Sequence, residues 1–125
     1  MRGEEYLTKP RQYALVYSQG SSWASDWLVM KALPNGLTLS RYGFSVSRRV
    51  GKAVVRNRVK RRLRQILRAA PLKAGWDIIF IARQSAAEAD YAGLKSVVER
   101  LLSRASLLAI NSESGRPAEV KASGG

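Results

Sequence analysis

Residues 43–64 read GFSVSRRVGKAVVRNRVKRRLR, and a change of pattern inside this stretch decides the fold. Over 42–47, apolar side chains alternate with small ones, which predicts a strand buried on one side, whose small face leaves room for a ligand. From about Lys52 to Ala70 the apolar residues recur at helical spacing, and Pro71 ends the run. The apolar positions of this predicted amphipathic helix are Val55, Val59, Leu63, Ile66 and Leu67.

Two elements are predicted before this stretch. Thr8 as a candidate N-cap and Pro10 in the first turn predict a short helix that ends at about Gln19. An apolar strand over 27–33 then meets the turn signal Pro34-Asn35-Gly36, after which the chain is again extended. This order predicts a hairpin between the strand before the turn and the strand after it.

Two more elements are predicted after the basic helix. Residues 76–82 hold a run of consecutive apolar side chains, which predicts a central strand covered on both faces. From Asp90, a candidate cap, an apolar stripe predicts a last helix that packs on the sheet. The expected fold class is α/β, a two-layer sandwich of one small mixed sheet of about four strands with three helices. Residues 1–108 are expected to form a single domain, and 109–125 a disordered tail.

The composition excludes several classes of protein. A chain of 125 residues with 46% hydrophobic residues can bury one modest core. It contains no Cys and no His, so catalytic side chains of these types, disulfides and the usual zinc sites are excluded, and no metal ligands are expected. No apolar run approaches the roughly 20 residues that cross a bilayer. The start of the chain lacks the pattern of a signal peptide, so a cytoplasmic location is expected.

The net charge of +13 is concentrated in one segment. Between Asp26 and Asp77 there are 13 Lys or Arg and no acid, whereas the remaining 9 cations match the 9 acids elsewhere. Arg56, Lys60 and Arg64 lie four residues apart, and each such like-charged pair destabilises an isolated helix by roughly 0.2–0.5 kcal/mol. A solvated charged face is the ordinary interpretation of a mixed-sign run, but this run has no acids. It therefore indicates a polyanionic partner, and its many arginines favour RNA without excluding DNA.

The same stretch resembles the signature region of the bacterial ribonuclease P protein subunit. The matching features are the strand end Ser45-Val46-Ser47, the turn at Gly51 and the triplet Arg56-Asn57-Arg58 one turn into the basic helix. The resemblance covers roughly 7–108. It implies a ribonucleoprotein endoribonuclease that removes the 5′ leader of precursor tRNA, with the active site and its Mg²⁺ carried by a large catalytic RNA. It also implies that the connection from the strand at 42–47 through the basic helix to the strand at 76–82 is left-handed, whereas such crossovers are usually right-handed.

The resemblance implies that the catalytic RNA and precursor tRNA are the partners, with no cofactor bound by the protein alone and no obligatory protein partner. Tyr13 and Tyr17 on the first helix are candidates for stacking on leader bases, and packing of that helix on the sheet is the alternative role. A further aromatic residue of some family members aligns with Met30. The expected RNA-binding residues are Arg48, Arg49, Lys52, Arg56, Asn57, Arg58, Lys60, Arg61 and Arg64.

Other functions remain open at this point. A ribosomal or RNA-chaperone protein would explain the charge equally well, although it would not require this combination of strand, turn and triplet. A nuclease acting without RNA would need clustered carboxylates, which the basic segment lacks. A DNA-binding module has no visible helix-turn-helix or zinc pattern to support it.

Overall fold

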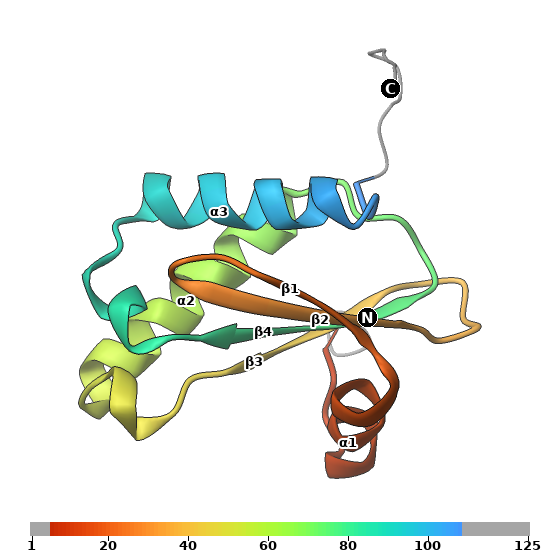
Figure 1. Ribbon diagram of the computed structural model, residues 1–125, viewed down its shortest axis with the longest axis horizontal. Helices are drawn as coiled ribbons and strands as arrows, with labels where there is room; N and C mark the ends of the chain where they lie inside the picture. Colours follow the sequence, from red (N-terminus) through yellow and green to blue (C-terminus); the bar gives the residue numbers. More distant parts are fainter. Residues whose placement is uncertain (1–5, 109–125) are drawn as a thin grey trace.

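The computed structural model describes residues 6–108, so the tail predicted over 109–125 lies outside the described residues. Within the described range the chain forms one four-stranded sheet with the order β1-β2-β4-β3 (Figure 1). The pairs β1–β2 and β2–β4 are antiparallel, whereas β3 and β4 are parallel. The strands are β1 Ser21–Ala24, β2 Leu28–Pro34, β3 Arg41–Ser45 and β4 Trp76–Ala82.

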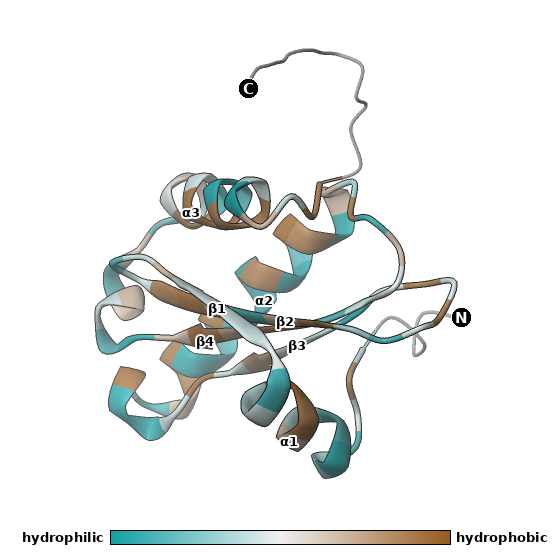
Figure 2. Cartoon of the chain, turned by 45° about the vertical axis from the view of Figure 1, so that its right-hand side comes forward, coloured by the Kyte–Doolittle hydropathy of each residue, from teal (hydrophilic) through white to brown (hydrophobic). Residues whose placement is uncertain are grey.

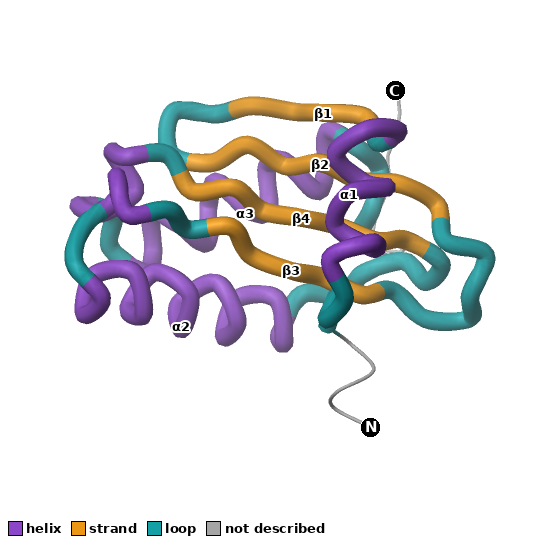
Figure 3. Tube along the Cα trace, turned by 90° about the horizontal axis from the view of Figure 1, so that it is seen from below, coloured by secondary structure: helices purple, strands orange, loops and turns teal. Residues whose placement is uncertain are grey.

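Helices lie on both faces of the sheet. Helices α2 (Ala53–Ala69) and α3 (Tyr91–Arg104) form a layer on one face, and α1 (Pro10–Gln19) crosses part of the other (Figures 1 and 3). Two short 3₁₀ turns, η2 (Arg48–Val50) and η3 (Gln84–Glu88), precede α2 and α3. The α/β class, the mixed four-stranded sheet and the three helices are therefore confirmed. In residues 6–108, no helix is long and apolar enough to span a membrane.

The crossover from β3 through α2 to β4 is left-handed, as the resemblance implied. Both parallel strands point to the left in Figure 1, where α2 lies on the same face as α3. Figure 3, seen from the α1 side, shows β4 above β3 and α2 along the β3 edge. The usual right-handed connection would place α2 on the side of α1. The handedness puts the basic helix beside the β3 edge, on the face that α1 leaves free.

The predicted hairpin is wrong in its partners. The hairpin joins β1 to β2, with Trp23 opposite Met30, whereas β4 separates β2 from β3. After the turn signal the chain does not fold back on β2, because Asn35 ties it to the start of β4. The backbone N–H of Asn35 donates to Gly75 O at 2.8 Å, and its Nδ2 donates to Asp77 Oδ1 at 2.9 Å. A turn signal specifies a reversal and not the pairing partner.

A larger core lies between the sheet and α2 and α3, and a smaller one lies under α1. Figure 2 shows hydrophobic and hydrophilic residues alternating along α2, and the buried residues of α2 are those of the predicted stripe apart from the half-buried Val55. Strand β4 serves both cores, since Phe80 belongs to the larger and Ile79 to the smaller. Met30 is fully buried in the larger core. Its side chain therefore faces away from α1, the helix that carries the stacking candidates Tyr13 and Tyr17.

The helix starts follow local hydrogen bonding. Asp90 caps α3 as predicted, since its Oδ1 accepts a hydrogen bond from Gly93 N at 2.8 Å. In α1 the N-cap is Lys9 and not Thr8. The side chain of Gln12 reaches back, and its Oε1 accepts from the backbone N–H groups of both residues, at 2.9 Å from Thr8 N and 3.0 Å from Lys9 N. Gln12 thus provides a hydrogen-bond acceptor for two backbone N–H groups at the helix start that a Thr8 side chain would leave without one.

Candidate nucleic-acid interface

The predicted RNA-binding residues lie on α2 and on the turn before it. Asn57 and Arg61 are exposed on α2, and Arg56, Lys60 and Arg64 follow one another at half-exposed positions one turn apart. The remaining cations at the start of the helix, Arg48, Arg49 and Lys52, are all exposed. The structure therefore gathers these eight residues, all of the predicted set except Arg58, into one basic strip along the β3 edge of the molecule.

The turn that presents Arg48 and Arg49 is built from neighbouring residues. The backbone N–H of Arg49 donates to Ser47 Oγ at 3.3 Å, while Val50 is buried and anchors the turn to the core. Gly51 then has φ of +153°, which disfavours residues with a side chain, and a Cβ there would lie 3.0 Å from that of Val55. A glycine at position 51 therefore allows the backbone conformation through which the chain enters α2.

No residue of the basic strip has a carboxylate partner within residues 6–108. The ion pairs in this range join Arg41 to Asp77 and Lys95 to Glu99. The first is bidentate, with 2.9 Å from Arg41 Nε to Oδ1 and 2.8 Å from Nη2 to Oδ2, and these hydrogen bonds raise the pKa of Arg41. The fold therefore neutralises Arg41, although it belongs to the same basic segment of the sequence. The residues of the strip remain unpaired and can bind an external polyanion.

Two half-buried arginines of α2, Arg58 and Arg62, donate to carbonyl groups of the segment that follows β4. Arg62 Nη1 donates to Ala89 O at 2.7 Å, and Arg58 Nη2 makes a longer contact of 3.4 Å with Ala87 O. The Nε atom of Arg58 is buried without a hydrogen-bond partner among the described residues. Arg58 thus holds η3 in place in addition to its predicted RNA contact. Sequence analysis missed Arg62, although its position four residues after Arg58, beside the apolar stripe, was a usable signal.

The small face of β3 is occupied by a side chain of the protein itself. The ring of Tyr13 lies over Gly43, where an added Cβ would be only 2.3 Å from Tyr13 Oη. The hydroxyl donates to Leu7 O at 3.3 Å, and burial raises the pKa of Tyr13. Tyr17, one turn later, is 40% exposed. The room above Gly43 is therefore filled by the half-buried Tyr13, which packs α1 on the sheet, whereas Tyr17 is exposed and can contact a ligand.

Fold and surface together define the class of protein. The crossover helix of a small mixed sheet carries a strip of arginines and lysines without acidic partners, and such a strip is the electrostatic footprint of nucleic-acid binding. The number of half-exposed and exposed arginines suits RNA, because a guanidinium both binds phosphate and stacks on unpaired bases. The molecule is a small α/β RNA-binding protein.

Comparison with known proteins identifies the family. A family model described as ribonuclease P matches residues 1–106. The ribonuclease P protein component of Dehalococcoides mccartyi (strain CBDB1) is 47% identical over 113 residues, which cover 90% of this chain and 94% of the relative. The chain therefore belongs to the family of ribonuclease P protein components, and the ribosomal or RNA-chaperone alternative is not favoured.

Solved structures agree with this assignment. A Staphylococcus aureus RNase P protein mutant superposes with a TM-score of 0.82 at 29% identity, covering 86% of this chain and 93% of that one. The RNase P protein from Thermotoga maritima gives a TM-score of 0.74 at 31% identity and covers 80% and 96%. The family resemblance of the basic segment thus extends to the arrangement of the whole domain.

Proposed function

We propose that this chain is the protein subunit of a ribonucleoprotein endoribonuclease that removes the 5′ leader of precursor tRNA. In this proposal it binds a large catalytic RNA and the leader, and the active site belongs to the RNA. The observation that carries the proposal is the basic strip on η2 and α2, which no carboxylate of residues 6–108 neutralises. Membership of the ribonuclease P family supports RNA as the polyanion that would neutralise it.

Different parts of the surface would contact different RNA segments. The strip on α2 binds phosphates of structured RNA, because Arg61 and its neighbours project from a rigid helix. Arg48, Arg49 and Lys52 lie at the helix start, where the positive end of the helix dipole adds to the attraction for phosphate. Tyr17 projects from α1 on the opposite face of the sheet, and there it stacks on a base of the single-stranded leader.

The side chains of this protein then act by binding and screening. Two polyanions, the catalytic RNA and its substrate, repel each other, and a strip of fixed cations between them lowers that repulsion. Mg²⁺ is held by the RNA in this proposal and supplies the metal chemistry of cleavage. The carboxylate of Asp77 is already engaged by Arg41 and Asn35, and that of Asp90 caps α3. Both have structural roles.

The test is cleavage of precursor tRNA by a bacterial ribonuclease P RNA at low Mg²⁺, with and without this protein. We expect wild type to stimulate cleavage, protein alone to be inactive, and the double variant Lys60→Ala, Arg61→Ala to stimulate much less. The matched control is Lys95→Ala, Arg100→Ala, which removes two exposed cations from α3, away from the strip. RNA binding without stimulation of cleavage would overturn the proposal in favour of an RNA-chaperone role.

Salt dependence provides a second readout. Each single-strand phosphate contact contributes about −0.7 to the slope of log affinity against log salt concentration. If on the order of 6 phosphates are contacted, the slope is about −4. A flat response would contradict binding through the strip.

A further inference from the structure

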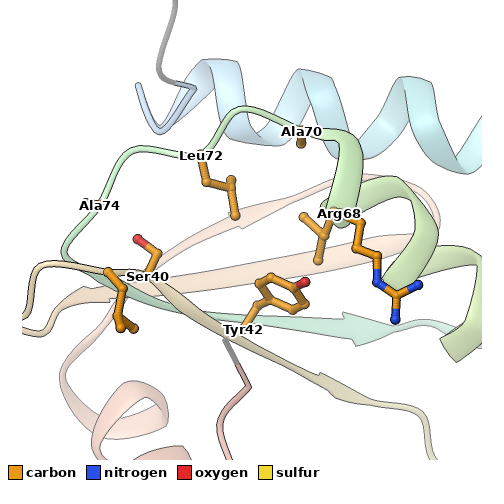
Figure 4. Close-up of a pocket in the computed structure, with 8 residues that line it drawn as sticks. Ser40, Tyr42, Arg68, Ala70, Leu72 and Ala74 are labelled. Carbon is orange, nitrogen blue, oxygen red and sulfur yellow. The ribbon is translucent and has the colours of Figure 1, made fainter. Parts of the chain in front are cut away.

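A pocket of about 300 Å³ lies at the carboxyl end of α2, beside the start of β3. Figure 4 shows Leu72, from the loop that follows α2, pointing across the pocket toward Tyr42 and Ser40 on β3 and the segment before it. Arg68, from the last turn of α2, stands at the side of Tyr42. The pocket thus joins the far end of the basic helix to the β3 edge of the sheet.

The cations at this pocket continue the basic strip. Arg68 follows Arg56, Lys60 and Arg64 at the same four-residue interval, so it extends their row to the pocket. Lys73 is exposed in the same loop, between two residues that line the pocket. No carboxylate is among the lining residues. An RNA strand that follows the row of α2 would therefore reach the pocket with its phosphates next to Arg68.

The interior of the pocket differs from its rim. Tyr42 and Leu67 are buried and form the floor of the pocket, and the half-buried Leu72 forms an apolar wall. The ring of Tyr42 is held by an edge contact with Tyr6 at 5.0 Å and a tilted contact with Phe44 at 5.8 Å between ring centroids, so the floor is preformed. Apolar side chains inside and cations at the rim suit a nucleobase with its phosphate better than a phosphate alone.

We propose that this pocket binds one unpaired nucleotide of the partner RNA, with the base inside and its phosphate on Arg68. The inference rests on the proposed function, because that function supplies the RNA. A volume of about 300 Å³ is at the lower end of the range for small-molecule sites, which fits a single nucleotide and not a base pair. The site anchors the end of an RNA segment that the rest of α2 binds through its backbone.

The test uses the complex of the full chain with ribonuclease P RNA and two variants. Ala74→Phe fills the pocket without changing charge, and Arg68→Gln removes the rim cation without filling it. We expect Ala74→Phe to weaken RNA binding about tenfold with an unchanged salt slope, since the base is excluded from the pocket while every cation stays in place. Arg68→Gln should weaken binding and reduce the magnitude of the slope by about 0.7. Arg100→Gln on α3 is the control and should change neither.

Chemical probing of the RNA bases gives a second, independent readout. We expect wild-type protein to protect one unpaired base that both variants leave reactive, while Arg100→Gln still protects it. If the variants bind as wild type, or if the protection pattern is unchanged, the pocket site is overturned while the proposed function stands. If wild type neither binds the RNA nor stimulates cleavage, the proposed function itself fails. Arg68 is exposed, so Arg68→Gln alone decides the question if Ala74→Phe does not fold.

Discussion

Arg62 of α2 donates a hydrogen bond of 2.7 Å from Nη1 to the carbonyl oxygen of Ala89, 27 positions later in the chain. This bond ties the basic helix to the segment between η3 and α3. Because η3 packs against η2, the same bond also supports the turn that presents Arg48 and Arg49. A residue of the basic segment therefore positions RNA-binding side chains from within the fold.

Replacement of Arg62 should mainly affect stability. Arg62→Met keeps the length of the side chain but leaves Ala89 O without its charged donor, which should cost about 1–2 kcal/mol in the free energy of unfolding. Chemical denaturation measures this loss, and amide exchange over 84–89 should become faster. The control is Arg61→Met, an exposed neighbour that should leave stability within about 0.5 kcal/mol while weakening RNA binding. Equal stability of the two variants would show that Arg62 does not hold η3.

Loss of the carboxylate at Asp77 should destabilise the fold more strongly. Asp77→Asn leaves the half-buried guanidinium of Arg41 without its ion-pair partner, and breaking such a pair typically costs about 3–5 kcal/mol when fully buried. Since the side chain of Arg41 is 21% exposed, we expect about 2–3 kcal/mol in thermal or chemical unfolding. The double variant Arg41→Met, Asp77→Asn should recover part of the loss. No recovery would mean that Asp77 acts through Asn35 alone.

The free energy of unfolding should fall at alkaline pH, in part because the half-buried Tyr13 ionises. Burial raises the pKa of Tyr13 above the ordinary value of 10.0, so the folded state holds the phenol proton more tightly than the unfolded state. The resulting stabilisation is fully present below the unfolded pKa and is lost as pH rises through the folded pKa. Tyr13→Phe should therefore lose less stability than wild type when unfolding is followed from neutral pH to above pH 10. Parallel curves would exclude this linkage.

Gly43 should not tolerate a side chain while Tyr13 is present. In Gly43→Ala the new methyl group would lie 2.3 Å from Tyr13 Oη, and the ring must shift, at a cost of about 1–3 kcal/mol. Combining this change with Tyr13→Leu should give a smaller loss than the sum of the single variants, because the smaller side chain makes room. Strictly additive losses in denaturation experiments would contradict the contact.

Local pattern determined the elements that carry function. The helices α2 and α3 were readable because their buried residues repeat at helical spacing, and β4 was readable because its residues are apolar on both faces, which the two cores cover. The charge of the basic strip was equally visible, since it depends only on the absence of acids between Asp26 and Asp77. The triplet at 56–58 and Gly51 then connected this pattern to a family.

Contacts between distant residues were decided by the tertiary structure. The strand order places β4 between β2 and β3, because Asn35 and Arg41 both bind Asp77 and carry the chain across the start of β4. Tyr13 fills the space above Gly43 of β3, and Arg58 donates to a carbonyl of η3. The local pattern of each element already shows which of its residues are charged and which are apolar. Which cations bind acceptors inside the protein, as Arg41 and Arg62 do, is visible only in the folded structure, because those acceptors are far away along the chain.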